Sequence, residues 1–348
     1  MVTKIKRRFI LYAQNCLHAL GSKTANGLIL FRPNEVQVIV DASKAGQTSQ
    51  DVLGYGGSIP IVAHISEALK YHPDTFVLGM APIGGAVKPS WMPEIKMALE
   101  AGLNVWTGLH HLLGDMEELK KYQHLIWDAR KSPPGLKVAQ GHWRARKSKV
   151  ILTIGSDSNV GKMTTALTLQ QQLKEIGLDS IFVGTGQTGM IISGRGVAVD
   201  AIVSDFVNGA AEAEIDKVDG QAPLIIVEGQ GAVTHIGYSG VTMGLLHGVM
   251  PDAYVLAHQP SRLVDDYDHP LPGISEVIDL HEALMHPFKS AKVLGINLYS
   301  KDMSPKQSQK ACESIYEETG LPVEDMVKAP KRIVAEKVLR DLFPENNM

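Results

Sequence analysis

A short apolar strand that runs into a glycine-containing loop and then into a helix is the feature that most constrains this chain. Residues 150–154 read Val-Ile-Leu-Thr-Ile, a run typical of a buried strand, and a helical pattern starts at Lys162. The loop between them ends in Gly161-Lys162. Strand, glycine loop, Gly-Lys and helix form the layout of a phosphate-binding loop, where backbone N–H groups and a lysine ammonium face phosphate oxygens. The sequence therefore predicts an α/β domain that binds a phosphorylated ligand.

The loop departs from the usual phosphate-loop pattern in two places. Ser156 stands at the first glycine position, with Gly155 one residue earlier, and Met163 replaces the hydroxyl residue that normally binds magnesium. Thr164 or Thr165 would have to reach a metal instead. A polyphosphate ligand without an obligatory metal therefore fits at least as well as Mg-ATP. The predicted ligand-binding residues are Gly155, Ser156, Asp157, Ser158, Asn159, Val160, Gly161, Lys162, Met163 and Thr164.

Length, charge and cysteine content narrow the class of protein. A chain of 348 residues suggests two domains, and a net charge of −3 gives no general attraction to nucleic acid or anionic membranes. Two cysteines, Cys16 and Cys312, provide neither a disulfide framework nor zinc spacing, and no apolar stretch approaches the ~18 residues of a membrane span. We therefore expect a cytoplasmic homo-oligomer that acts on a small-molecule substrate, with no nucleic-acid or membrane partner.

Strand-like and helix-like segments alternate along both halves of the chain. In the first half we expect strands at residues 9–13, 27–31, 36–40, 76–80, 104–107 and 125–127, and helices at residues 60–69, 91–101 and 111–121. In the second half we expect strands at residues 150–154, 180–183, 224–227, 253–256 and 292–298, and helices at residues 162–175, 197–213, 275–285, 305–319 and 330–342. Such alternation predicts mainly parallel sheets with helices on their faces.

The connection between the halves is marked by composition. Residues 128–149 carry a Pro-Pro-Gly turn and a basic cluster, which are typical of an exposed linker. We therefore expect a Rossmann-like domain over residues 1–135 and a P-loop NTPase-like domain over residues 136–348. No G-x-G-x-x-G follows the first strand, so the ligand of the N-terminal domain stays open.

Polar residues follow the predicted strands of the second half, where open parallel sheets bind their ligands. Glu228 lies at the tip of an apolar strand and is placed to hold a metal or accept a proton, and His235 is a second acid–base candidate in the following loop. Asp200 is a third, although a carboxylate there also compensates a helix dipole. The run 184–189 would form a second cradle for an anionic substrate, with Arg195 as a cation. The predicted substrate-binding residues are Thr185, Gly186, Gln187, Thr188, Arg195, Tyr238 and Ser239.

Part of this pattern resembles dethiobiotin synthetase and its relatives. The run from Gly155 to Lys162 is similar to their variant phosphate loop, in which the first glycine is likewise one place early. Glu228-Gly229 resembles their acidic metal-binding position, and Asn297 resembles their adenine-contacting asparagine. This resemblance implies ATP with magnesium, held by Thr164 and Glu228, and a carboxylate-activating ligase or kinase.

A broader resemblance covers nearly the whole chain. The motifs at 184–189, 196–200, 228–231 and 238–248 are similar to a family long catalogued as a domain of unknown function, members of which have since been linked to N-acetylation of D-glutamate. This resemblance implies an N-acetyltransferase that uses acetyl-CoA, whose phosphates a phosphate loop can hold. The ATP-dependent ligase is the alternative, and a nucleotide-binding regulatory protein is a second alternative.

Overall fold

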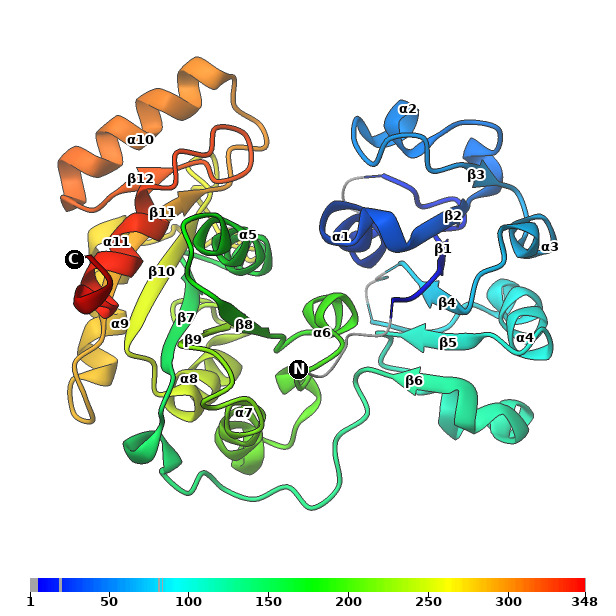
Figure 1. The fold of residues 1–348 in the computed structure, drawn as a ribbon, viewed down its shortest axis with the longest axis horizontal. Coiled ribbons are helices and arrows are strands. Elements are labelled where there is room, and N and C mark those ends of the chain that lie inside the picture. Colours follow the sequence, from blue (N-terminus) through cyan, green and yellow to red (C-terminus); the bar gives the residue numbers. More distant parts are fainter. Residues whose placement is uncertain (1–5, 19–20, 81, 83, 348) are drawn as a thin grey trace. The chain divides into compact units, whose positions relative to one another are not determined.

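The computed structural model describes residues 6–18, 21–80, 82 and 84–347, and the chain divides into two units. The first unit comprises Met1–Ser132 and Gln187–Ala201, and the second comprises Pro133–Gly186 and Ile202–Met348. Each unit is built on a six-stranded sheet in which all strand pairs are parallel (Figure 1). The predicted α/β architecture is therefore confirmed.

The sheet of the first unit has the order β3-β2-β1-β4-β5-β6. Its strands are β1 (Phe9–Tyr12), β2 (Val36–Val40), β3 (Ile61–Val62), β4 (Thr75–Leu78), β5 (Asn104–Thr107) and β6 (Ile126–Asp128). Its α-helices are α1 (Lys23–Phe31), α2 (Ser49–Leu53), α3 (Ile65–Ala68), α4 (Met92–Glu100) and α6 (Gln187–Ser193). The central strands β1 and β4 are buried throughout, because helices cover both faces of a parallel sheet. The strand order is that of a Rossmann fold, as predicted.

Three expectations for the first unit were wrong in detail. Residues 27–31, expected as a strand, form the second half of α1, and the helix expected at 60–69 begins instead with β3. Residues 111–121, expected as an α-helix, are 3-10 turns at Leu113–Asp115 and Glu117–Leu125. Short apolar runs fit a strand or a buried helix face equally well, so periodicity alone does not separate them.

The sheet of the second unit has the order β12-β11-β10-β7-β9-β8. Its strands are β7 (Lys149–Gly155), β8 (Ser180–Val183), β9 (Leu224–Val227), β10 (Ala253–His258), β11 (Lys292–Leu298) and β12 (Val323–Glu324). Its α-helices are α5 (Lys162–Glu175), α7 (Val207–Asp216), α8 (Ser239–Val249), α9 (Ile274–Met285), α10 (Pro305–Thr319) and α11 (Ile333–Leu342).

The order in which successive strands are added to the sheet reverses between β7 and β10. From β7 the chain moves through α5 toward β8, whereas the later connections return past β7 to β10, β11 and β12. Open α/β sheets bind ligands outside the carboxyl ends of the strands at such a switch point. The loop that follows β7 lies there, and it is the predicted phosphate loop.

The expected helix at 197–213 is shorter than predicted. Residues Val199–Ala201 and Ser204–Phe206 form 3-10 turns, and the α-helix α7 starts only at Val207.

Within the described residues, no helix combines the length and the apolar character needed to cross a membrane.

Candidate functional site

The phosphate loop has the backbone of an anion cradle. β7 ends at Gly155 and α5 begins at Lys162, so the loop leads directly into a helix N-terminus. Gly161 has φ +97°, which residues with a Cβ rarely adopt, and Asn159 has φ +57°, which asparagine tolerates. A Cβ on Gly155 would lie 2.8 Å from the Asp157 carbonyl oxygen and 2.9 Å from the Lys162 Nζ. The loop therefore closes tightly around the lysine.

Lys162 is held inside its own loop. The side chain is 7% exposed, and its ammonium donates a hydrogen bond to the Asp157 carbonyl at 2.7 Å. A bound phosphate would compete for this ammonium with a neutral carbonyl, which is the weaker acceptor.

A small cavity lies below the loop, with Lys162, Gly155, Gly229 and His281 among its lining residues. His281 is fully buried, and burial lowers its pKa to about 4, so the ring is neutral at physiological pH. Its Nδ1 bonds the Val277 carbonyl at 2.7 Å, which places the proton on Nδ1, and Nε2 has no partner among the described residues.

Hydrogen bonds join the loop after β7 to the last two residues of β10 across the switch point. Ser156 Oγ lies 2.9 Å from His258 Nδ1, and the Ser156 N–H donates to the Ala257 carbonyl. Burial lowers the pKa of His258 to about 4, so this ring too is neutral at physiological pH. His258 was not singled out from the sequence.

The other predicted coenzyme-binding residues have unequal surroundings. Ser158 and Val160 are buried in the loop, whereas Met163 and Thr164 are half-buried in the first turn of α5. Asn297 lies in β11, where its amide donates to Thr165 Oγ1 at 2.8 Å and accepts from the Met326 N–H at 2.9 Å. The amide keeps a second N–H donor and a second acceptor lone pair, and contact between Asn297 and an adenine stays a prediction.

Glu228 follows β9 directly and is buried, with 5% exposure. Its Oε2 accepts backbone N–H groups from Thr185 at 3.0 Å and from Gly186 at 3.2 Å, both in the loop after β8. Two backbone donors stabilise the ionised carboxylate. A Cβ on Gly186 would lie 2.0 Å from the Gln230 amide nitrogen, so a larger residue there would displace the Gln230 side chain. The structure therefore brings together the predicted residues Glu228, Thr185 and Gly186.

The remaining residues of the predicted substrate loop belong to the first unit. Gln187 and Thr188 begin α6, and Thr188 Oγ1 lies 2.9 Å from Thr24 Oγ1 at the start of α1. Asp200, predicted as an acid–base candidate, forms an ion pair with Arg130. Arg195 is exposed after α6. A substrate role for these residues stays a prediction.

His235 lies in a pocket of aromatic rings between β9 and α8. The imidazole is fully enclosed, stacks on Tyr238 at 4.6 Å between ring centroids, and meets Tyr267 edge-on at 5.6 Å. The Gly237 N–H donates to His235 Nδ1 at 3.1 Å, so in the neutral ring the proton is on Nε2. A proton-acceptor role for His235 would thus require this loop to open. Ser239 is half-buried at the start of α8.

Two charged residues of the β10–α9 loop complete this region and were missed from the sequence. Arg262 forms ion pairs with Asp157 of the phosphate loop and, at 2.7 Å, with Asp266. The available signal was their position after the strand at 253–256, at the same sheet edge as the phosphate loop.

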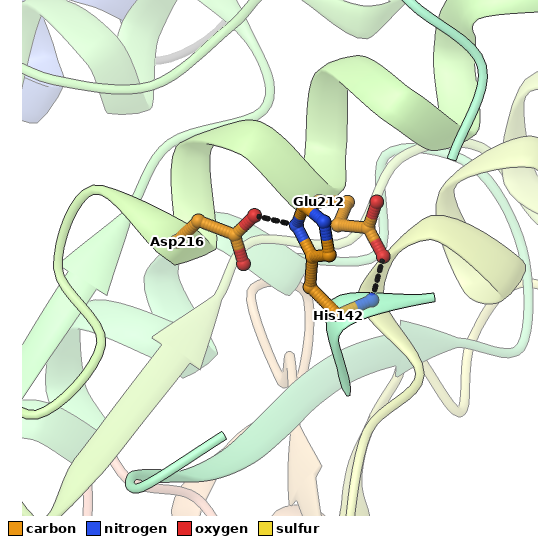
Figure 2. A group of neighbouring side chains, drawn as sticks. All are labelled: His142, Glu212 and Asp216. Carbon is orange, nitrogen blue, oxygen red and sulfur yellow. Dashed lines mark hydrogen bonds and ion pairs between the residues drawn. The ribbon is translucent and has the colours of Figure 1, made fainter. Parts of the chain in front are cut away.

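A group of potential metal ligands lies away from the phosphate loop, at His142, Glu212 and Asp216 (Figure 2). His142 Nδ1 bonds Asp216 at 2.7 Å, and Glu212 accepts the backbone N–H groups of Gln140 and His142. Both carboxylates thus already have hydrogen-bond donors. Their negative charges also interact with the buried Arg146 guanidinium. These hydrogen bonds fasten residues 140–142 to α7.

The site and the two sheets define a class of protein: an α/β protein that combines a Rossmann-like unit with a phosphate-loop unit. Residues 137–334 match the P-loop domain of DUF1611, described as a domain of unknown function, and residues 42–132 match the Rossmann-like N-terminal domain of the same family. The chain belongs to the DUF1611 family.

Two relatives of the chain are named for the same activity. A D-glutamate N-acetyltransferase from a Pseudoalteromonas species is 37% identical over 273 residues, which cover 76% of this chain and 81% of the relative. A second protein of that name, from Tritonibacter scottomollicae, is 32% identical over 332 residues, covering 92% and 95%. The crystal structure of a DUF1611 family protein from Anabaena variabilis superposes with a TM-score of 0.90 at 32% identity, covering 96% of this chain and 100% of that chain.

Proposed function

We propose that the protein is a D-glutamate N-acetyltransferase that binds acetyl-CoA at the phosphate loop. The observation that carries this proposal is the 37% and 32% identity to two relatives of that name over most of the chain. The fit of the loop to a polyphosphate is the structural support, because a glycine cradle, a helix N-terminus and a buried lysine converge there.

In this proposal the phosphate loop binds the coenzyme's phosphates. Lys162 exchanges the Asp157 carbonyl for a phosphate oxygen, and the N-terminus of α5 adds its partial positive charge. Met163 supplies no oxygen ligand for magnesium, which acyl transfer does not need. Acetyl-CoA supplies the thioester carbonyl when it is bound.

The acceptor amine has to lose a proton before it attacks a carbonyl. Glu228 is our candidate for this base, since it is buried at the end of β9 and the Thr185 and Gly186 N–H groups fix the orientation of its carboxylate. His235, with its proton on Nε2, is suited in this geometry to donating rather than accepting.

A specific observation keeps the ATP-dependent ligase as second candidate. A Cβ on Gly229 would lie 3.1 Å from Lys162 Cδ, so the residue after Glu228 lies against the phosphate-binding lysine. A carboxylate at that place is suited to hold Mg²⁺ on a nucleotide.

The test is release of free thiol from acetyl-CoA across a panel of D- and L-amino acids. We expect release with D-glutamate and a loss of roughly 100-fold or more in kcat for Glu228→Gln, the usual span for a general base. Glu317→Gln, on the exposed side of α10, is the matched control and should keep the wild-type rate. Thiol release with none of the amino acids at saturating acetyl-CoA would refute the proposal, and ADP formation with magnesium would establish the ligase instead.

A further inference from the structure

The β10–α9 loop connects two buried groups that the fold otherwise keeps apart. At one end is Asp157 of the phosphate loop, which is 0% exposed and whose Oδ1 has no partner in the described part of the chain. At the other end is His235, also enclosed, whose Nε2 has no hydrogen-bond partner there either. Both are polar groups that the low dielectric of the interior makes costly to leave unmatched.

Arg262 and Asp266 span the distance between them. The Arg262 Nε pairs with Asp157 Oδ2, and the Arg262 Nη2 pairs with Asp266 Oδ1 at 2.7 Å. The second oxygen of the same carboxylate, Asp266 Oδ2, lies 3.7 Å from His235 Nε2. That distance is about 0.5 Å beyond the upper end, ~3.2 Å, of the usual range for an N–H···O hydrogen bond. A small movement of Asp266 toward His235 would therefore complete a series of polar contacts from the phosphate loop to the imidazole.

We propose that Asp266, held by Arg262, is a positioning residue that couples occupancy of the phosphate loop to the hydrogen bonding of the His235 imidazole. The coupling is local and physical: a ligand on the phosphate loop acts on Asp157, Asp157 holds Arg262, and Arg262 sets the place of the carboxylate that faces Nε2. The identity of the ligand rests on the proposed function. The contacts from Asp157 through Arg262 and Asp266 to His235 are independent of the proposed function.

The exposure of the four side chains agrees with such a device. The two ends are fully buried, Arg262 is 20% exposed, and Asp266 is 48% exposed. Arg262 and Asp266 can therefore move in solvent, while the Asp157 and His235 side chains stay fixed in packed surroundings. The neighbouring Asp265 does a different task, since its Oδ1 accepts the Tyr267 and His269 N–H groups and shapes the turn.

The first arm of the test needs no ligand. Nitrogen-15 NMR of the full chain reports the tautomer and the Nε2 shift of each histidine, and the His235 signals are assigned by their loss in His235→Gln. We expect Asp266→Asn to change the His235 Nε2 shift, because the facing carboxylate charge is removed. Asp268→Asn is the matched control, since Asp268 is exposed on the same loop and its φ of +60° suits asparagine. Equal His235 shifts in wild type and Asp266→Asn would overturn the proposal.

The second arm tests the coupling with a ligand. Saturating CoA should shift His235 Nε2 in the wild type and leave it nearly unmoved in Asp266→Asn, whose CoA affinity stays within about threefold because the substituted side chain does not belong to the phosphate loop. An identical response in both proteins, or none in a saturated wild type, would contradict the coupling. If CoA does not bind, Mg-ADP replaces it as the probe, so that failure of the proposed function is distinguished from failure of the coupling.

The third arm uses turnover. Asp266→Asn should lower kcat by about tenfold with little change in the KM for acetyl-CoA, the pattern of an interaction made in the transition state. Asp266→Glu, which keeps the carboxylate, should recover part of the rate. A change in KM alone, without rescue by glutamate, would mean that Asp266 merely shapes the loop.

Discussion

Replacing Lys162 by alanine tests the phosphate loop most sharply, because the structure separates its effect on binding from its effect on folding. The ammonium is buried and donates a hydrogen bond to the Asp157 carbonyl. Removing it leaves that carbonyl short of a donor, which costs about 1 kcal/mol of stability. For a domain of this size such a loss lowers Tm by about 2–4 °C, so the fold should survive.

The loss in ligand binding should be larger. A buried ammonium facing phosphate oxygens makes charge-assisted contacts, and its removal is expected to cost about 2–4 kcal/mol. This corresponds to a Kd raised by roughly 30- to 700-fold. Calorimetric titration of acetyl-CoA into Lys162→Ala measures it, and Lys174→Ala, exposed in the last turn of the same helix, is the control that should bind like wild type. Unchanged affinity in Lys162→Ala with a wild-type melting curve would refute the assignment of the phosphate loop.

Three further predictions concern metal, the linker and pH. A chelator should leave most thiol release intact, because Met163 offers no hard oxygen to magnesium; complete loss restored by magnesium would favour the ligase. Limited trypsinolysis should cut first within residues 131–137, which are mostly exposed, whereas Glu212 fastens the backbone that follows; first cuts elsewhere would contradict this account of the linker. The hydrogen bond to Asp216 raises the pKa of His142 above the ordinary histidine value of 6.5, so the stabilisation by this pair is fully present below pH 6.5 and is lost as pH rises through the raised pKa. An NMR titration should show a midpoint above 6.5 that falls in Asp216→Asn, and an unmoved midpoint would contradict the contribution of Asp216.

The parts of the fold that the sequence predicted are those with a strong local signal. β7 is a continuous apolar run followed by a glycine loop, and α5 carries a long helical pattern, so both were placed nearly to the residue. The helix α8 was missed because Gly240, Gly244 and Gly248 hide it. A Cβ on Gly248 would lie 2.4 Å from the Asn208 carbonyl oxygen, and one on Gly244 would lie 2.7 Å from Val207 Cγ1. These two glycines therefore allow the close approach of α7, a long-range contact that local propensity does not report.

The site was predicted unevenly for a similar reason. The phosphate loop and Glu228 directly follow apolar strands, and open parallel sheets bind their ligands at the carboxyl ends of the strands, so both could be placed in the site from the sequence. Arg262 and Asp266 lie in an irregular loop without periodicity, and their importance follows only from which buried groups they meet in space. Likewise, the assignment of Gln187–Ala201 to the first unit depends on packing against α1, which no local pattern in that segment indicates.

The most direct test of the central claim is a calorimetric comparison of two ligands on the wild-type protein. Acetyl-CoA and ATP are titrated separately, each with magnesium and with chelator. The account predicts that acetyl-CoA binds with the same affinity in both conditions and more tightly than ATP. Magnesium-dependent ATP binding together with no detectable heat from acetyl-CoA would contradict it.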